Sequence, residues 1–417
     1  MTDNNKDDDT IRLFRPALRA ASDNLKEICQ LAVQEVMELE TRKRKRTAEA
    51  QLRFEQRIDA IICNALHAYL SSNYDYCAVP RSKVHMNSSR YKSDLITKDF
   101  PVVLDQLDIA DFVTLKQPKS DWHRQRLFPS EKLIDLTRKI DLSFDDFDYL
   151  IDEEETIILK TEDPTRKRDK SGTIPKKLKE YPDTDETNRF RKELTIINNH
   201  LHSFDVNLEG AQDHDFVHRQ LVRSFNDMYD GVDFAGGGRL WGGTWQNMSK
   251  KDRRSRLMID GQKIAEVDFN QMMPCLMYTL ADKEPPQDDL YDVSDYSRAG
   301  LKKIFNAMTF RGRLRNYPDG VAKYFNDDTK VSEIQNAIKA KHKSVAHLFQ
   351  KGLGHKLQRM ESDILVKTML VLAEFGCPCL PIHDALLCRE TDAKKVAMTM
   401  ENSATLITGY KLRVSIK

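Results

Sequence analysis

Two short segments, KIAEVDF at residues 263–269 and LPIHDALL at residues 380–387, decide the fold of the second half of the chain. Both are rich in β-branched and apolar residues, which is typical of buried strands. The first follows Asp260-Gly261, a strong hairpin turn signal, so we expect it to pair with a strand at 254–260 before that turn. The second belongs to two short strands, expected at 379–382 and 385–389, which are joined at His383-Asp384. An aspartate therefore lies at a strand end, Asp268, and another at a hairpin tip, Asp384.

The segments around these strands predict an α+β fold. Helical patterns cover residues 272–280, 297–310 and most of 331–375, another covers 392–407, and 411–416 has the pattern of a closing strand. The elements follow one another as a strand pair, helices, a second strand pair, a helix and a strand. This order predicts an antiparallel sheet with helices on one face.

The rest of the chain divides by composition. Residues 1–10 are polar and acidic and are expected to form a disordered tail. Residues 11–160 are expected to form a mainly α-helical N-terminal region. Residues 161–182 are rich in Lys, Arg, Pro and Thr and predict a basic linker or loop. Residues 183–417 are expected to form the core that contains Asp268 and Asp384.

Composition limits the class of protein. The 417 residues include 66 Lys and Arg against 65 Asp and Glu, so no global charge indicates a nucleic-acid partner. No apolar run approaches the ~18 residues of a membrane helix, and we expect neither a membrane nor a secreted protein. The seven cysteines form no CxxC pair, which favours reduced thiols in a cytoplasmic protein, without disulfides or a zinc site.

Asp268 and Asp384 are candidates for a shared metal site. Either residue alone is most simply a turn former. On neighbouring strands of one sheet, however, two carboxylates suit Mg²⁺, which prefers one or two carboxylates together with water and phosphates. A pair of ions there, with Mn²⁺ as a possible substitute, would activate a hydroxyl and stabilise leaving pyrophosphate.

The helix predicted at 297–310 carries a polar stripe between these aspartates. Arg298, Lys302, Asn306 and Phe310 follow one another at intervals of four residues and so share one face. Two cations, an amide and an aromatic ring suit a nucleoside triphosphate laid along the helix. The alternative is a solvated basic face with Phe310 in the core.

In chain order, five segments resemble elements of family-A DNA polymerases, the bacterial polymerase I type, and of the related single-subunit phage-type RNA polymerases. They are Gly238-Arg239-Leu240 with Trp245-Gln246-Asn247, Asp268-Phe269-Asn270-Gln271 (motif A), Arg298-x3-Lys302-x7-Phe310-x-Gly312 (motif B), His383-Asp384 (motif C) and the closing strand at 411–416. The resemblance covers about residues 230–417. It implies a right-hand polymerase palm with short fingers, in a compact member of phage or mobile-element type, and a thumb-like or nucleic-acid-binding N-terminal region.

The resemblance also implies roles for single residues. Asp268, Asp384 and the backbone carbonyl of Phe269 would hold two Mg²⁺ ions. Lys302 would be catalytic as the proton donor to pyrophosphate. The incoming nucleotide would contact Arg298, Lys302, Asn306, Phe310 and Met273. The nucleic acid would contact Arg239, Gln271, His383, Arg311 and Arg313.

The expected activity is addition of dNTPs to a primer 3′-hydroxyl, as in a DNA-directed DNA polymerase that acts in DNA replication. The expected partner is a DNA primer–template, with RNA as the alternative. Family-A DNA polymerases have Glu at the position of Met273 and Tyr at that of Phe310, so the choice of sugar stays open. One alternative is a primase-like enzyme, a single-subunit RNA polymerase or a template-independent nucleotidyltransferase. Another is a non-catalytic replication factor that binds nucleic acid with a polymerase-like palm.

Further residues have two interpretations each. The basic segments Arg42–Arg46 and Arg166–Lys179 could bind phosphates or form a charged helix face and a loop. Trp241 and Trp245 could stack on bases or pack in the core.

Overall fold

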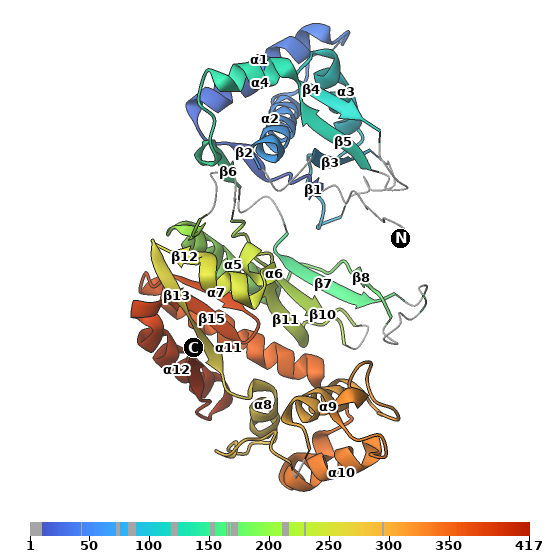
Figure 1. The fold of residues 1–417 in the computed structure, drawn as a ribbon. Coiled ribbons are helices and arrows are strands. Elements are labelled where there is room, and N and C mark those ends of the chain that lie inside the picture. Colours follow the sequence, from blue (N-terminus) through green and yellow to red (C-terminus); the bar gives the residue numbers. More distant parts are fainter. Residues whose placement is uncertain are drawn as a thin grey trace, which may run out of the picture. The chain divides into compact units, whose positions relative to one another are not determined.

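The chain forms two compact units in the computed structural model (Figure 1). The residues described are 11–42, 44–71, 76–81, 89–117, 124–150, 155–163, 165, 167, 174–210, 217–228, 231–293 and 296–417. Unit 1 comprises Met1–Glu155 and Asn207–Val217, and unit 2 comprises Thr156–Val206 and His218–Lys417. The tail expected at residues 1–10 lies outside the described residues.

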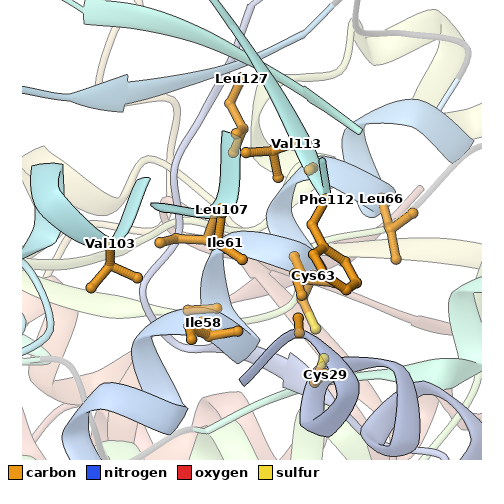
Figure 2. Close-up of a cluster of buried hydrophobic side chains, with 14 of the residues drawn as sticks. Cys29, Ile58, Ile61, Cys63, Leu66, Val103, Leu107, Phe112, Val113 and Leu127 are labelled. Atoms are coloured by element: carbon orange, nitrogen blue, oxygen red, sulfur yellow. The ribbon is translucent and has the colours of Figure 1, made fainter. Parts of the chain in front are cut away.

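Unit 1 packs helices against a small sheet. The sheet runs in the order β1 (Ile11–Leu13), β3 (Tyr76–Pro80), β5 (Arg124–Pro129), β4 (Val113–Lys116), and β2 (Leu18–Ala20) pairs separately with β6 (Phe147–Tyr149). The helices are α1 (Asp23–Leu39), α2 (Ala48–Leu70), α3 (Phe100–Ile109) and α4 (Glu131–Arg138), and they make up most of the regular structure. Ser22 and Thr47 cap α1 and α2 by accepting bonds from backbone amides, which fixes where these helices begin. Side chains from α1, α2, α3 and the strands form an apolar core that includes Cys29 and Cys63 (Figure 2).

A mixed sheet begins unit 2. Its order is β11 (Gly236–Trp241), β10 (Val222–Asn226), β7 (Ile157–Glu162), β8 (Lys176–Leu178), with β10 and β7 parallel and the other pairs antiparallel. The segment at 161–182, expected as a basic linker or loop, therefore supplies the end of β7 and all of β8. The reason for the difference is that β8 is an exposed edge strand, so its sequence lacks the apolar alternation of a half-buried strand.

The central sheet contains both predicted hairpins. Its order is β14 (Cys379–Ile382), β15 (Ala385–Arg389), β13 (Gln262–Phe269), β12 (Leu257–Ile259), all antiparallel, and β16 (Val414–Ile416) also pairs with β13. The strand β9 (Val206–Leu208) lies where the chain passes from unit 2 to unit 1. The strand before Asp260 is shorter than predicted, because residues 254–256 belong to helix α7 (Lys250–Arg256).

Helices complete unit 2 and give the expected α+β fold. They are α5 (Asp185–His202), α6 (Thr244–Asn247), α7, α8 (Met272–Leu280), α9 (Arg298–Phe310), α10 (Val331–Lys341), α11 (Gly354–Glu374) and α12 (Ala393–Thr408). Short 3-10 helices lie in unit 1 at Phe144–Asp146 and in unit 2 at Ala322–Tyr324, Lys343–Leu348 and Glu390–Asp392. Helix α12 packs against β13, β15 and β16, and α11 packs against β11 and α12. Within the described ranges, none of the helices is long and apolar enough to cross a membrane.

All seven cysteines are buried free thiols. Cys379 and Cys388 face each other across β14 and β15. Burial raises the pKa of the Cys77 and Cys388 thiols to about 12 and that of Cys275 to about 11, since a thiolate is poorly solvated in an apolar core.

Candidate active site

Unit 2 contains a cavity of about 600 Å³ at the ends of β13 and of the β14–β15 hairpin. Helices α8, α9 and α11, the loop after α8 and the last residues of the chain supply the remaining walls. Ten of the residues singled out in the sequence line it: Arg239, Asp268, Phe269, Gln271, Met273, Arg298, Lys302, Asn306, His383 and Asp384. Segments that are far apart in the sequence therefore line one continuous cavity.

The two aspartates are brought together by strand register. Asp268 lies opposite Ala385 across β13 and β15, next to Asp384. The backbone N–H of Phe269 donates to the carbonyl oxygen of Asp384 (3.4 Å). His383 makes the tight turn with φ of 54°, a left-handed conformation that is uncommon for a residue with a side chain. Both carboxylates thus lie at the same end of the sheet, on rigid backbone.

The electrostatics of the cavity disfavour a second negative charge. Burial, followed by the charges of Glu361 and Asp268, raises the pKa of Asp384 to about 7. Glu361, on α11, is 2% exposed and accepts two bonds from the guanidinium of Arg239 (2.6 and 2.9 Å). Lys417 forms an ion pair with Asp268. The carboxylate of Asp384 is therefore the least compensated charge among these residues.

The donor set fits a hard divalent cation. Carboxylate and carbonyl oxygens at the ends of β13 and β15 are the ligand types that Mg²⁺ takes. A buried carboxylate whose pKa is raised by neighbouring carboxylates would be relieved by a bound cation. Asp268, Asp384 and the carbonyl of Phe269 are accordingly the residues that could hold such ions.

A tighter cluster of ligand atoms lies elsewhere, in unit 1. Atoms of Cys29, Asp59 and Cys63 lie within 4.8 Å of one another. Oδ1 of Asp59 accepts bonds from the backbone amide of Ala20 (3.0 Å) and from the thiol of Cys63 (3.1 Å). A hydrogen-bond network therefore accounts for this cluster.

Helix α9 presents its cations to the cavity beside an aromatic ring. The guanidinium of Arg298 lies 5.4 Å, and the ammonium of Lys302 5.9 Å, from the ring centroid of Tyr291. Arg298 also pairs with Asp289. Oδ1 of Asn306 is buried and has no hydrogen-bond partner among the described residues. This wall offers positive charge and an unsatisfied acceptor to a ligand.

Phe310, Arg311 and Arg313 do not line the cavity, although the sequence grouped them with it. The ring of Phe310 packs against Gly354 and, edge-on, against the ring of His355 at 5.3 Å. The cause is helical drift: at 3.6 residues per turn, twelve residues rotate the side chain by about 120° from Arg298. A spacing of four residues keeps neighbours together but not the two ends of the stripe.

Two residues expected to contact nucleic acid are engaged within the protein. Arg239 pairs with Glu361, as described above. Gln271 has φ of 56°; its Oε1 accepts from the amide of Leu290 (2.5 Å) and its Nε2 donates to the carbonyl of Asp288 (3.4 Å). In this structure Gln271 therefore ties the loop after α8 to the start of that helix.

The two tryptophans separate into a core residue and a surface residue. Trp245 is fully buried and its indole N–H donates to the carbonyl of Pro381 (2.8 Å). Trp241 is 42% exposed and meets the ring of His383 edge-on at 5.5 Å. Only Trp241 of these two is available to stack on a base.

Sequence reasoning missed several residues of the cavity lining, among them Glu361, Tyr291, Arg413 and Lys417. Glu361 is a single acid on a long helix, and no local pattern marks it. The closing segment did carry a signal, since cations alternate with apolar residues at Lys411, Arg413 and Lys417. Alternation of this kind indicates one polar face of a strand.

Comparison with known proteins gives a limited picture. No family model matches the chain, and no curated protein matches it. Among solved structures, the chain is similar to the POL domain of Pol1 from M. smegmatis, solved in complex with a DNA primer-template and dNTP. The TM-score is 0.31 and the identity 12%, over 55% of this chain and 50% of that one. The chain thus spans about half the length of that structure.

Proposed function

We propose that unit 2 catalyses template-directed nucleotidyl transfer, with a DNA-directed DNA polymerase as the most specific form. The observation that supports it best is the meeting of Asp268 and Asp384 in one cavity with Arg298 and Lys302 of α9. Motifs A, B and C, weak when taken singly, supply these residues in the expected order. A primer 3′-hydroxyl would attack the α-phosphate of a dNTP, and pyrophosphate would leave.

Asp268, Asp384 and the carbonyl of Phe269 would hold two Mg²⁺ ions, for which Mn²⁺ can substitute. When bound, the ions supply the positive charge that activates the hydroxyl and stabilises the leaving group. Lys417 pairs with Asp268 and lies 3.9 Å from Glu266, so its ammonium has a second carboxylate close by. We therefore assign to Lys417 the task of neutralising Asp268 while no cation is bound.

The residues of α9 would bind and orient the triphosphate. Arg298 and Lys302 would contact the phosphate oxygens, and the Lys302 ammonium would give a proton to the departing pyrophosphate. The unsatisfied Oδ1 of Asn306 would accept a bond from the nucleotide. Tyr291, packed beneath both cations, would hold them in place.

The nucleic acid would meet the side of the cavity lined by His383 and Arg239, next to Trp241. His383 would contact the phosphate of the primer terminus, with the exposed ring of Trp241 beside it. Met273, in the cavity wall, would crowd a ribose 2′-hydroxyl and so favour dNTPs.

The test is a primer-extension gel with the purified full chain and Mg²⁺ or Mn²⁺. Labelled dNTPs and NTPs are compared, each with and without primer and template. We expect extension by dNTPs only when both strands are present, and none by Asp268→Ala or Asp384→Ala. Asp328→Ala, an exposed acid remote in sequence from all three motifs, is the matched control.

The same gel distinguishes the polymerase activity from the alternative functions. Incorporation of NTPs without a primer would indicate a primase or RNA polymerase, and incorporation without a template would indicate a template-independent transferase. If the Asp268→Ala/Asp384→Ala double variant extends primers normally, the proposal fails. The absence of any incorporation by the parent protein would favour a non-catalytic nucleic-acid-binding factor.

A further inference from the structure

A second cavity in unit 2, of about 610 Å³, shares no lining residue with the first. Strands β7, β8 and the end of β10 form it together with the first turn of α11. Its lining is Lys160, Thr161, Glu162, Lys176, Lys177, Asn226, Asp227, Met228 and His355. Because β8 is the edge strand of its sheet and its side chains are exposed, this cavity is accessible.

The lining has an excess of positive charge. Of its two acids, Asp227 is paired with Lys179, and bonds from Lys179 and Asp233 hold the pKa of Asp227 at about 2 despite the opposing effect of desolvation. Glu162 then faces Lys160 and Lys176, and Lys177 forms an ion pair with Asp163 (3.8 Å), so the lining itself has three lysines against two acids. Burial lowers the pKa of Lys176, against the opposing effect of Glu162, which means that its charge is incompletely compensated.

Helix α11 connects this cavity to the catalytic one. His355 lines the second cavity and Glu361 the first, and six residues of helix separate them by about 9 Å. The ring of His355 also touches Phe310 at the end of α9, and burial, followed by the charge of Lys176, lowers the pKa of His355, with a smaller contribution from Arg239.

We propose that this second cavity binds the phosphate backbone of a nucleic-acid strand of the primer–template. The proposal rests on the proposed polymerase function for the identity of the strand. Its ligands are lysines, point charges that hold phosphates without reading bases. Spread along a β-ribbon, they suit successive phosphates of a chain better than a single free phosphate, which would need converging donors.

The test is the salt dependence of DNA binding. The triple variant Lys160→Gln/Lys176→Gln/Lys177→Gln removes three charges, and glutamine keeps a donor for Oδ1 of Asn226, which Lys176 now bonds. Fluorescence anisotropy of a labelled primer–template, in EDTA and without nucleotide, gives affinity over a series of KCl concentrations. We expect affinity at about 0.1 M salt to fall at least tenfold, and the slope of log K against log salt to become shallower by about 2 to 3.

The matched control is Lys263→Gln/Lys394→Gln/Lys395→Gln, which removes three exposed lysines from β13 and α12. We expect its slope to stay within about one of the parent value. An equal loss in both triple variants, or an unchanged slope in the first, would overturn the proposal. So would displacement of the DNA by inorganic phosphate beyond the effect of chloride at the same ionic strength, because this would indicate a free-phosphate site.

Failure of this inference and failure of the proposed function are distinguishable. Binding is measured without metal or nucleotide, so it does not depend on catalysis. If the parent extends primers but the lysine variant binds DNA as the parent does, only the assignment of the second cavity falls. If the lysine variant loses affinity while the parent incorporates nothing, the cavity still binds nucleic acid and the polymerase activity falls.

Discussion

Replacing Asp384 with Asn should stabilise the protein while removing the proposed nucleotidyl-transfer activity. The folded state holds the Asp384 proton more tightly than the unfolded chain, because the pKa rises from 3.8 to about 7. The contribution of this group to stability is therefore complete below about pH 4 and is lost as the pH rises to about 7. A shift of about 3 pKa units corresponds to about 4 kcal/mol of lost stability at higher pH. Asn carries no charge and escapes this loss.

The assay is denaturant unfolding in EDTA at pH 5 and pH 8, followed by the fluorescence of buried Trp245. We expect Asp384→Asn to exceed the parent in free energy of unfolding by up to about 4 kcal/mol at pH 8 and by a smaller margin at pH 5. The exposed substitution Asp328→Asn should show no such pH-dependent gain. Added Mg²⁺ should stabilise the parent at pH 8 more than the variant, since a ligand that binds only the folded state adds to stability.

Two results would refute this reasoning. One is a variant no more stable than the parent at pH 8. The other is the same difference in free energy at both pH values, which would mean that packing and not charge distinguishes Asn from Asp at this position.

Three other substitutions test separate parts of the structure. Lys302→Ala should slow incorporation under single-turnover conditions more than it weakens primer–template binding. Equal single-turnover rates for the variant and the parent would contradict the proposed role of Lys302 at the leaving group. Gly354→Ala would place a Cβ 2.3 Å from the ring of Phe310, so denaturant melts should show a loss of about 1–3 kcal/mol. Arg223→Met should cost about 1.5–3 kcal/mol in the same assay, because it removes the buried guanidinium that donates to Ser362 and Asp363, while Arg359 still pairs with the partly exposed Asp363; a loss below about 0.5 kcal/mol would show that these bonds contribute little.

Local sequence patterns predicted the elements that carry the candidate site. The strands at 379–382 and 385–389 and the helix at 272–280 have the predicted bounds, because apolar runs and turn residues act within a few positions. The segment Asp183-Thr184-Asp185-Glu186 predicts a helix start with an acidic cap and Glu at the capping-box position, but the cap is formed by Thr184 and Thr187. Several polar residues in a row can each begin a helix, and side-chain geometry decides among them.

Partners distant in the chain could not be predicted in this way. Lys417 meets Asp268 across 149 positions, and Arg239 meets Glu361 across 122. Such ion pairs depend on how β16 and α11 pack against the sheet and leave no periodic trace in the sequence. The proximity of Asp268 and Asp384 was predicted only because each lies at the end of a recognisable strand.

Because all seven native thiols are buried, a cysteine added at the surface can be labelled selectively. Maleimides react with thiolates on the surface, so the seven native cysteines should resist modification while the fold is intact. A cysteine introduced in place of the exposed Lys303 on α9 would then be the preferred attachment point for a dye, with no native cysteine replaced. Fluorescence from that dye would report movement of α9 as substrates are added.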